Sequence, residues 1–132
     1  MGLIVDTGIF IKAEREEHRD PVALYAADGD LGICSITLSE LLEGLHYTKS
    51  PIQLEKRRLF IERTRSVLPI FAFDERIAEV HAQLRAKQRQ AGRMIGAHDL
   101  IIAATAMSLG WDVLTFNAAE FRQVKGLGVR EG

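Results

Sequence analysis

The sequence predicts an α/β fold in which a central, mostly parallel sheet of about five short strands carries helices on both faces, giving three layers. Two observations favour this fold. Short apolar runs alternate along the chain with longer segments of helical periodicity, which is typical of βαβ units. The apolar runs also lack the two-residue alternation of half-exposed strands, so we expect burial on both faces. With 132 residues, 47% of them hydrophobic, the chain is expected to form a single domain over residues 1–132.

Five segments are predicted to be strands: Leu3–Val5, Leu31–Cys34, a stretch within 67–73, Val113–Thr115 and a last strand that begins at Val129. The third segment contains Pro69, which cannot donate a ladder hydrogen bond, so this segment is expected to be a short or edge strand. Helical segments rather than hairpin turns separate the strands. We therefore expect them to pair in parallel.

Six segments are predicted to be helices: Gly8–Arg15, a short segment from Pro21, Thr37–His46, Pro51–Ser66, a segment after Asp74, and Leu100–Leu109. Asp20 before Pro21 is a good start signal, because Asp caps helices and Pro is favoured at the first helical position. The spacing in Thr37–Glu40 fits a capping box, so the third helix is expected to open there. The last helix is apolar nearly all round, which predicts a buried helix that Gly110 ends.

Composition excludes several classes of protein. The apolar content and a net charge of −1 exclude a disordered chain, and the single cysteine, Cys34, excludes a disulfide scaffold. Apolar runs never approach the roughly 18 residues of a membrane-spanning helix. Asp6 interrupts the first apolar run and no basic region precedes it, so no signal peptide is expected either. We therefore expect a cytoplasmic protein without a membrane partner, with Cys34 in its core.

Charge is distributed unevenly along the chain. Residues 1–48 carry 3 basic and 9 acidic side chains, residues 49–93 carry 11 and 5, and residues 94–132 carry 3 and 4. A molecule with this division can attract a polyanion on one face and a cation on another. The other interpretation is that the basic side chains form ordinary solvated helix faces.

Three carboxylates adjoin strongly apolar segments: Asp6, Glu40 and Asp99. In parallel sheets, ligands bind beyond the carboxyl ends of the strands. Asp6 follows the first predicted strand, Glu40 follows the second, and Asp99 heads the buried helix that leads into the fourth. A cluster made only of carboxylate oxygens suits Mg²⁺ or Mn²⁺. Zinc is not favoured, because the four histidines lack close ligand spacing.

Each acid also has a structural explanation of its own. Asp6 and Asp99 are each suited to cap a helix, and Glu40 occupies the third position of the capping box. Three hydroxyl residues at strand ends either orient these carboxylates by hydrogen bonds or simply cap the strands: Thr7, Ser35 and Thr115.

Four segments carry a resemblance to a known family: residues 3–7 (LIVDT), 34–44 (CSITLSELLEG), 95–104 (IGAHDLIIAA), and 114–121 (LTFNAAEF) followed by 124–127 (VKGL). In this order and spacing, the chain resembles the PIN domain family and, within it, the VapC-type toxins of toxin–antitoxin pairs. The resemblance covers nearly the whole chain, and its second and third segments are the most specific.

The resemblance implies a Mg²⁺-dependent endoribonuclease toxin, with Mn²⁺ able to substitute, that hydrolyses RNA phosphodiesters through a metal-activated water. Asp6 and Asp99 would hold the metal, and Glu40 would ligate it or orient a bound water. The implied substrate is a structured RNA such as transfer RNA. The implied partners are a second copy of the chain, giving a homodimer, and a cognate antitoxin that inserts a basic side chain into the acidic pocket.

Two positions depart from the family pattern. Asn117 stands where many members have a fourth acid; it remains a candidate catalytic residue, since an amide can bind a water or a phosphate oxygen. Glu120 lies nearby in sequence, but one helical turn is expected to displace it. Gly8 replaces the small polar residue usual there. The alternative to a nuclease is therefore a catalytically weak PIN domain that binds RNA or antitoxin.

RNA contact is expected to come from basic side chains in the middle of the chain, because phosphate charge dominates such binding. The candidates are Lys56, Arg57, Arg58, Arg85, Lys87 and Arg89. Aromatic residues are only 7% of the chain and mostly lie in apolar runs, so no base-stacking platform is expected.

Other families share fragments of the pattern. Asp6–Gly8 also matches the Asp-Thr-Gly of aspartic proteases, but those domains are almost entirely β. A phosphoacceptor receiver domain needs an acidic pair after the first strand, where only Asp6 stands, although Asp74 and Lys125 would fit its later positions. A haloacid-type phosphatase needs a second Asp where Gly8 stands.

Overall fold

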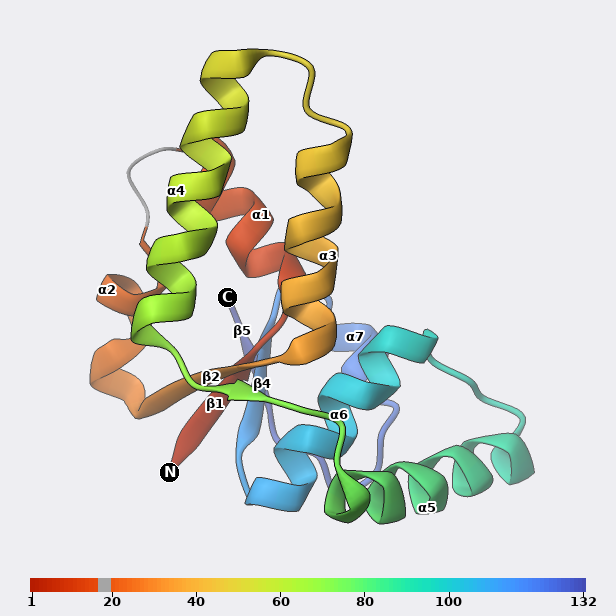
Figure 1. Cartoon of the computed structure of the whole chain (residues 1–132). Helices are drawn as coiled ribbons and strands as arrows, with labels where there is room; N and C mark the ends of the chain where they lie inside the picture. The colour runs from red at the N-terminus through yellow and green to blue at the C-terminus, as the bar shows by residue number, and fades with distance from the viewer. Residues whose placement is uncertain (17–19) are drawn as a thin grey trace.

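The computed structural model describes residues 1–16 and 20–132, and its centre is a five-stranded sheet in which every pairing is parallel (Figure 1). The strands are β1 (Gly2–Val5), β2 (Asp30–Cys34), β3 (Ile70–Phe71), β4 (Asp112–Thr115) and β5 (Val129–Glu131). Their order across the sheet is β3-β2-β1-β4-β5. This confirms the predicted fold class, including the edge position of the strand that follows Pro69.

The helices are α1 (Thr7–Arg15), α2 (Pro21–Tyr25), α3 (Ser35–His46), α4 (Pro51–Val67), α5 (Glu75–Ala91), α6 (Ala97–Leu109) and α7 (Ala118–Phe121), with a 3₁₀ turn, η1, at Ala26–Asp28. Figure 1 shows α1 and the α3–α4 hairpin on one side of the sheet, and α5 and α6 on the other. Among the described residues, no helix is long and apolar enough to cross a membrane.

The central strand β1 explains why the apolar runs do not alternate. Leu3 and Val5 belong to a core that includes Ile9 and Phe10 of α1, whereas Ile4 belongs to a core formed with α5 and α6. All four residues of β1 are buried. Helices thus cover both faces of the sheet at this central strand, so Leu3, Ile4 and Val5 in succession are all apolar.

The predicted start of the third helix is wrong. Helix α3 begins at Ser35, directly after β2, and no side chain caps it. Thr37 lies in the first turn, is fully buried, and has its hydroxyl 3.2 Å from that of Thr7 on α1. The capping box therefore does not form, and Glu40 lies in the second turn, where its side chain is available to a site.

The last long helix is buried as predicted but begins at Ala97, so Asp99 lies in its first turn rather than before it. Gly110 ends it in the left-handed conformation, with φ of 68°. Cys34 is 1% exposed, and burial raises the pKa of its thiol to about 11, so it is a core residue as expected.

Candidate active site

The carboxyl edge of the sheet brings together four acidic side chains. Asp6 directly follows β1, Glu40 comes from α3, Asp99 from the first turn of α6, and Glu120 from α7. The charges of Glu40 and Glu120 raise the pKa of Asp6, and the charges of Asp6, Glu120 and Glu40 raise that of Asp99. The three acids predicted from the sequence therefore do share one site, and Glu120 joins them.

Both carboxylate oxygens of Asp6 are held by hydrogen bonds. Its Oδ1 accepts a hydrogen bond from the backbone N–H of Thr7 at 2.8 Å, and its Oδ2 accepts one from the hydroxyl of Thr115 at 2.7 Å. Burial is the largest influence on this carboxyl and raises its pKa, while the two hydrogen bonds act in the opposite direction. Asp6 also caps α1, so the same side chain both stabilises the start of a helix and belongs to the acid cluster.

Glu40 is held from two sides. The hydroxyl of Thr7 donates to its Oε1 at 3.0 Å, and Nδ1 of His98 lies 3.5 Å from the same oxygen. Two of the three hydroxyl residues singled out from the sequence, Thr7 and Thr115, thus orient acids. Ser35 makes no hydrogen bond to a carboxylate within the part of the chain that the structure describes.

Asp99 and Glu120 form a hydrogen-bonded carboxyl pair. Burial, then the hydrogen bond with Glu120, then the neighbouring negative charges raise the pKa of Asp99 to about 7. The pKa of Glu120 is lowered, first by Asp99 and then by the backbone N–H of Gly96, which donates to its Oε1 at 2.9 Å. Near neutral pH the hydrogen-bonded pair therefore shares a proton for part of the time.

The expectation that a helical turn removes Glu120 from the site is wrong. Helix α7 is short and begins only two residues after the end of β4, and its first turn directs Glu120 toward Gly96, just before α6. A Cβ built on Gly96 would lie 3.6 Å from Oδ2 of Asp99 and 3.8 Å from Oε1 of Glu120. The glycine thus stands between the two carboxyls. A sequence signal for Glu120 existed in its position three residues after the strand-end Asn117.

Asn117 supports Glu120 instead of capping α7. Its side-chain Nδ2 donates to Oε2 of Glu120 at 2.5 Å, and its backbone N–H donates to the hydroxyl of Thr115 at 2.8 Å. Since that hydroxyl in turn donates to Asp6, one chain of hydrogen bonds runs from Asp6 to Glu120. Asn117 therefore lies beside the acid cluster and orients its fourth acid.

The cluster has the chemistry of a cation site without being a closed one. Among the described residues, no Lys or Arg forms an ion pair with any of the four acids, and burial, the hydrogen bond with Glu120 and the neighbouring negative charges together raise the pKa of Asp99. A divalent cation fits both the oxygen donors and the excess negative charge. No three His, Cys, Asp or Glu side chains of residues 1–16 and 20–132 are already arranged as a metal-ligand set.

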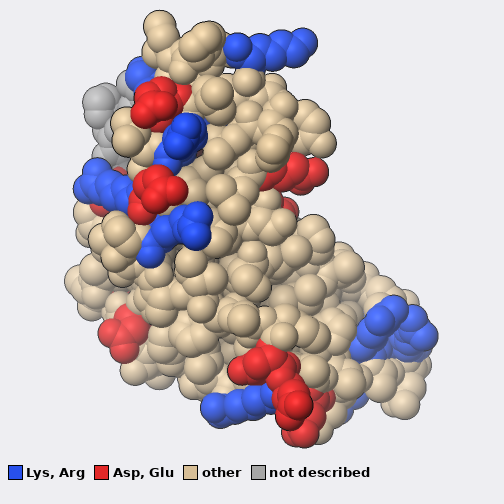
Figure 2. All heavy atoms as spheres, in the orientation of Figure 1, with Lys and Arg blue, Asp and Glu red and all other residues tan. Residues whose placement is uncertain are grey.

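The basic residues singled out from the sequence do not form one patch. Those of α4 lie along the α3–α4 hairpin among acidic residues, and those of α5 lie on the other side of the sheet (Figures 1 and 2). Arg85, Lys87 and Arg89 are exposed on α5. Lys56 and Arg58 are exposed on α4, whereas the guanidinium of Arg57 is occupied within the protein.

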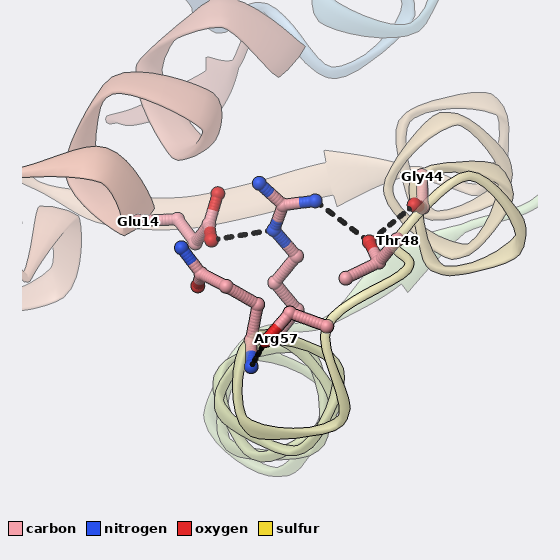
Figure 3. A network of polar contacts seen from close by, with 6 residues as sticks. Glu14, Gly44, Thr48 and Arg57 are labelled. Carbon is pink, nitrogen blue, oxygen red and sulfur yellow. Dashed lines mark hydrogen bonds and ion pairs between the residues drawn. The ribbon is translucent and has the colours of Figure 1, made fainter.

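Arg57 connects α4 to α1 and to the loop after α3 (Figure 3). Its Nε lies 2.8 Å from Oε1 of Glu14, and its Nη1 donates to the hydroxyl of Thr48 at 2.6 Å. That hydroxyl donates to the carbonyl of Gly44 at 2.8 Å. The network stabilises the α3–α4 hairpin beside the site.

Two adjoining hollows flank this network. The larger, of about 610 Å³, lies between α1, α2 and α4; the smaller, of about 180 Å³, lies between α1, α3 and α4 and has Glu40 in its wall. Both are lined by Phe10, Phe60, Glu14 and Arg57. The larger hollow lies away from the four acids. The candidate site is therefore identified by its cluster of acidic side chains and not by the size of a cavity.

Comparison with known proteins gives consistent matches over the whole chain. The PIN domain family model matches residues 3–127. Ribonuclease VapC1 of Rickettsia felis is 37% identical over 98% of this chain and 95% of its own, and the tRNA(fMet)-specific endonuclease VapC of Salmonella typhimurium is 32% identical over the same shares. The VapBC2 structure from Rickettsia felis, bound to a DNA fragment from its promoter, superposes with a TM-score of 0.86 at 27% identity, covering 100% of this chain and 99% of the other.

Proposed function

The chain belongs to the PIN domain family, and we propose that it is a metal-dependent endoribonuclease toxin that a cognate antitoxin neutralises. One observation carries the proposal: the carboxylates of four acids meet at the carboxyl edge of a parallel sheet, close enough that their charges act on the pKa of Asp6 and of Asp99. A site of this charge favours a cation and, through it, a phosphodiester. Relatives named as tRNA-specific endonucleases make a structured RNA, such as transfer RNA, the substrate class we propose.

We propose that Asp6, Asp99 and Glu40 would hold the metal, with Glu120 as a further acidic residue. PIN-domain ribonucleases are generally dependent on a divalent metal. We propose Mg²⁺, with Mn²⁺ as a substitute, because both prefer oxygen ligands. When bound, such an ion supplies charge neutralisation at the phosphodiester and lowers the pKa of a water.

Groups of the protein itself hold the acids in position. Thr115 and the backbone N–H of Thr7 fix both oxygens of Asp6, so this carboxylate loses little rotational freedom when it binds a ligand. The hydroxyl of Thr7 holds Glu40 in the same way. Asp99 and Glu120 share a proton for part of the time near neutral pH, and its release gives the cluster its full negative charge.

We assign RNA contact first to Arg85, Lys87 and Arg89, which are exposed on one helix. Lys56 and Arg58 form a second, separate candidate surface on α4. Arg57 stands between these two residues in the sequence, but its ion pair with Glu14 leaves its guanidinium less available to phosphate.

An antitoxin is the partner that the geometry accommodates. The two hollows adjoin each other and run between α1 and α4 to Glu40, with aromatic walls from Phe10 and Phe60. A segment seated there would reach the acid cluster, where an Arg or Lys would find unpaired carboxylates. The matched VapBC structures contain a toxin with its antitoxin. A homodimer is a further proposal, tested by light scattering of the purified chain.

The decisive experiment incubates purified protein with total bacterial RNA in Mg²⁺, in Mn²⁺ and in EDTA, beside Asp6→Asn. We expect discrete fragments with 5′-phosphates in the metal-containing samples only, and none with the variant. Cleavage that persists in EDTA, or in Asp6→Asn, would remove the metal assignment.

The alternative of a catalytically weak binding module rested on the missing charge at Asn117. Glu120 supplies a carboxylate at that side of the site, and Asn117 orients it. RNA that binds without turnover in any metal would nevertheless favour this alternative.

A further inference from the structure

An exposed aromatic ring belongs to the segment that follows β4, between two residues that hold acids of the cluster, and it lies against α1. Phe116 follows Thr115, the residue that holds Asp6, and precedes Asn117, the residue that holds Glu120. Its side chain is 47% exposed, although Thr115 before it and Ala118 after it are buried. An exposed phenylalanine between two site residues differs from the expectation that the chain offers no base-stacking surface.

Two glycines border this ring and leave it uncovered. A Cβ built on Gly8 would lie 4.0 Å from Cδ2 of Phe116, and one on Gly132 would lie 2.8 Å from Cε1. A side chain at either position would reach toward the ring. The absence of a polar side chain at Gly8, one of the departures from the family pattern, thus coincides with an exposed aromatic surface.

A cation accompanies the ring. Nζ of Lys12, on α1, lies 4.7 Å from the ring centroid of Phe116, within the range of a cation–π contact. Lys12 also lies 3.9 Å from Glu16, with about half of its side chain exposed. An exposed pair of this kind is weak, so the ammonium can exchange it for a phosphate at little cost.

The ring and the lysine also form part of a small hollow. Its volume is about 80 Å³, and Ile9, Leu24 and Tyr25 contribute apolar and aromatic wall. Binding of a nucleotide with its phosphate uses a stacking surface, an apolar wall and a positive charge, and this hollow offers all three.

We propose that Phe116 and Lys12 form a nucleotide-binding subsite beside the acid cluster, in which Phe116 stacks on an unpaired base next to the scissile phosphodiester and Lys12 contacts a phosphate. This inference rests on the proposed RNA cleavage. The subsite deepens the proposed function, because it predicts that the substrate is an RNA with an unstacked base at the cleavage site rather than a continuous duplex.

The test measures binding and cleavage separately. Binding of a fluorescein-labelled single-stranded RNA of about 12 nucleotides is measured by anisotropy in EDTA, where the proposed nuclease is inactive. The variants are Phe116→Leu, which keeps an apolar side chain against the glycines but no planar face, and Phe116→Trp, which keeps the face. Phe73→Leu is the matched control, because Phe73 is equally 47% exposed but lies between β3 and α5, away from the acids.

We expect Phe116→Leu to raise the Kd about fivefold to thirtyfold, as stacking losses do, with Phe116→Trp and Phe73→Leu near the wild type. Lys12→Gln should weaken binding and reduce its salt dependence, unlike Lys49→Gln in the exposed loop after α3. In Mg²⁺, Phe116→Leu should raise KM by a similar factor and change kcat less. Equal affinities for Phe116→Leu and Phe73→Leu would overturn the subsite.

The outcomes separate the two proposals. Metal-dependent cleavage with unchanged binding by Phe116→Leu removes the subsite and leaves the nuclease. Binding that depends on Phe116 without cleavage in any metal keeps the subsite and removes the nuclease. An absence of RNA binding by the wild-type chain removes the subsite directly.

Discussion

The hydroxyl of Thr115 donates to Oδ2 of Asp6 at 2.7 Å, across 109 positions of sequence. The same hydroxyl accepts a hydrogen bond from the backbone N–H of Asn117. This buried threonine therefore joins the ends of β1 and β4 to the start of α7. One side chain thereby fixes the relative positions of two parts of the site.

Replacing this threonine by valine keeps its shape and removes its hydrogen bonds. We expect Thr115→Val to lower the free energy of unfolding by about 1–3 kcal/mol, the usual loss for a bond to a charged group. Cleavage should fall as well, because Asp6 loses an orienting partner. Urea denaturation measures the first effect. Thr64→Val is the control, since that buried hydroxyl donates only to the carbonyl of Phe60 in its own helix.

The raised pKa of Asp99 predicts how stability depends on pH in the metal-free protein. Between the ordinary pKa of this carboxyl, 3.8, and about 7, the folded state binds more protons at this group than the unfolded state does. Its contribution to stability is therefore present at low pH and is lost as the pH rises through about 7. After allowance for partial exposure the effect is about 1 kcal/mol. Melting curves in EDTA at intervals from pH 5 to pH 8 measure it.

The control for this pH effect is Asp99→Asn, which cannot ionise. The melting temperature of this variant relative to wild type should rise with pH over that range, and Mg²⁺ should stabilise wild type more at the upper end. A constant difference at every pH would exclude Asp99 as the titrating group.

Glu120 is predicted to act with the three acids found from the sequence. Glu120→Gln keeps the hydrogen-bond acceptor but removes the charge, so metal affinity should fall about 10- to 100-fold, with a matching need for more Mg²⁺ in cleavage assays. Glu131→Gln is the control, because Glu131 pairs with Arg122 at the exposed end of β5. Equal metal dependence in the two variants would return Glu120 to a structural role.

The basic face of α5 is tested by charge reversal. Replacing Arg85, Lys87 and Arg89 by Glu should weaken RNA binding and flatten its dependence on salt, because each phosphate contact releases counterions. The measurement is Kd against salt concentration. A slope equal to that of wild type would identify these residues as an ordinary solvated surface.

The sheet was predictable because its signals are local. Runs such as Leu3–Val5 are apolar throughout only when both faces are covered, and Pro69 marks the edge strand. Local signals failed where a tertiary contact competes with them. Thr37 has the spacing of a capping residue, but its hydroxyl lies against Thr7, and the helix starts two residues earlier.

The site was predicted in part for the same reason. Asp6 and Glu40 each follow a predicted strand, so both could be found although the predicted start of α3 was wrong. Glu120 was missed because one turn of helix normally moves a side chain away from a strand end, whereas here Gly96 donates to it from a segment 24 residues earlier. The exposure of Phe116 depends on glycines 108 positions before it and 16 after it, which no local pattern connects.

The parallel arrangement places the two ends of the chain at opposite edges of the sheet. Met1 precedes β1 and is 91% exposed at the amino edge, whereas the N–H of Gly132 donates to the carbonyl of Thr115 at 2.9 Å, beside Phe116. An affinity tag or fusion partner joined after Gly132 therefore starts beside Phe116, at the carboxyl edge of the sheet. One joined before Met1 leaves that edge open, so immobilisation for binding measurements belongs at the amino terminus.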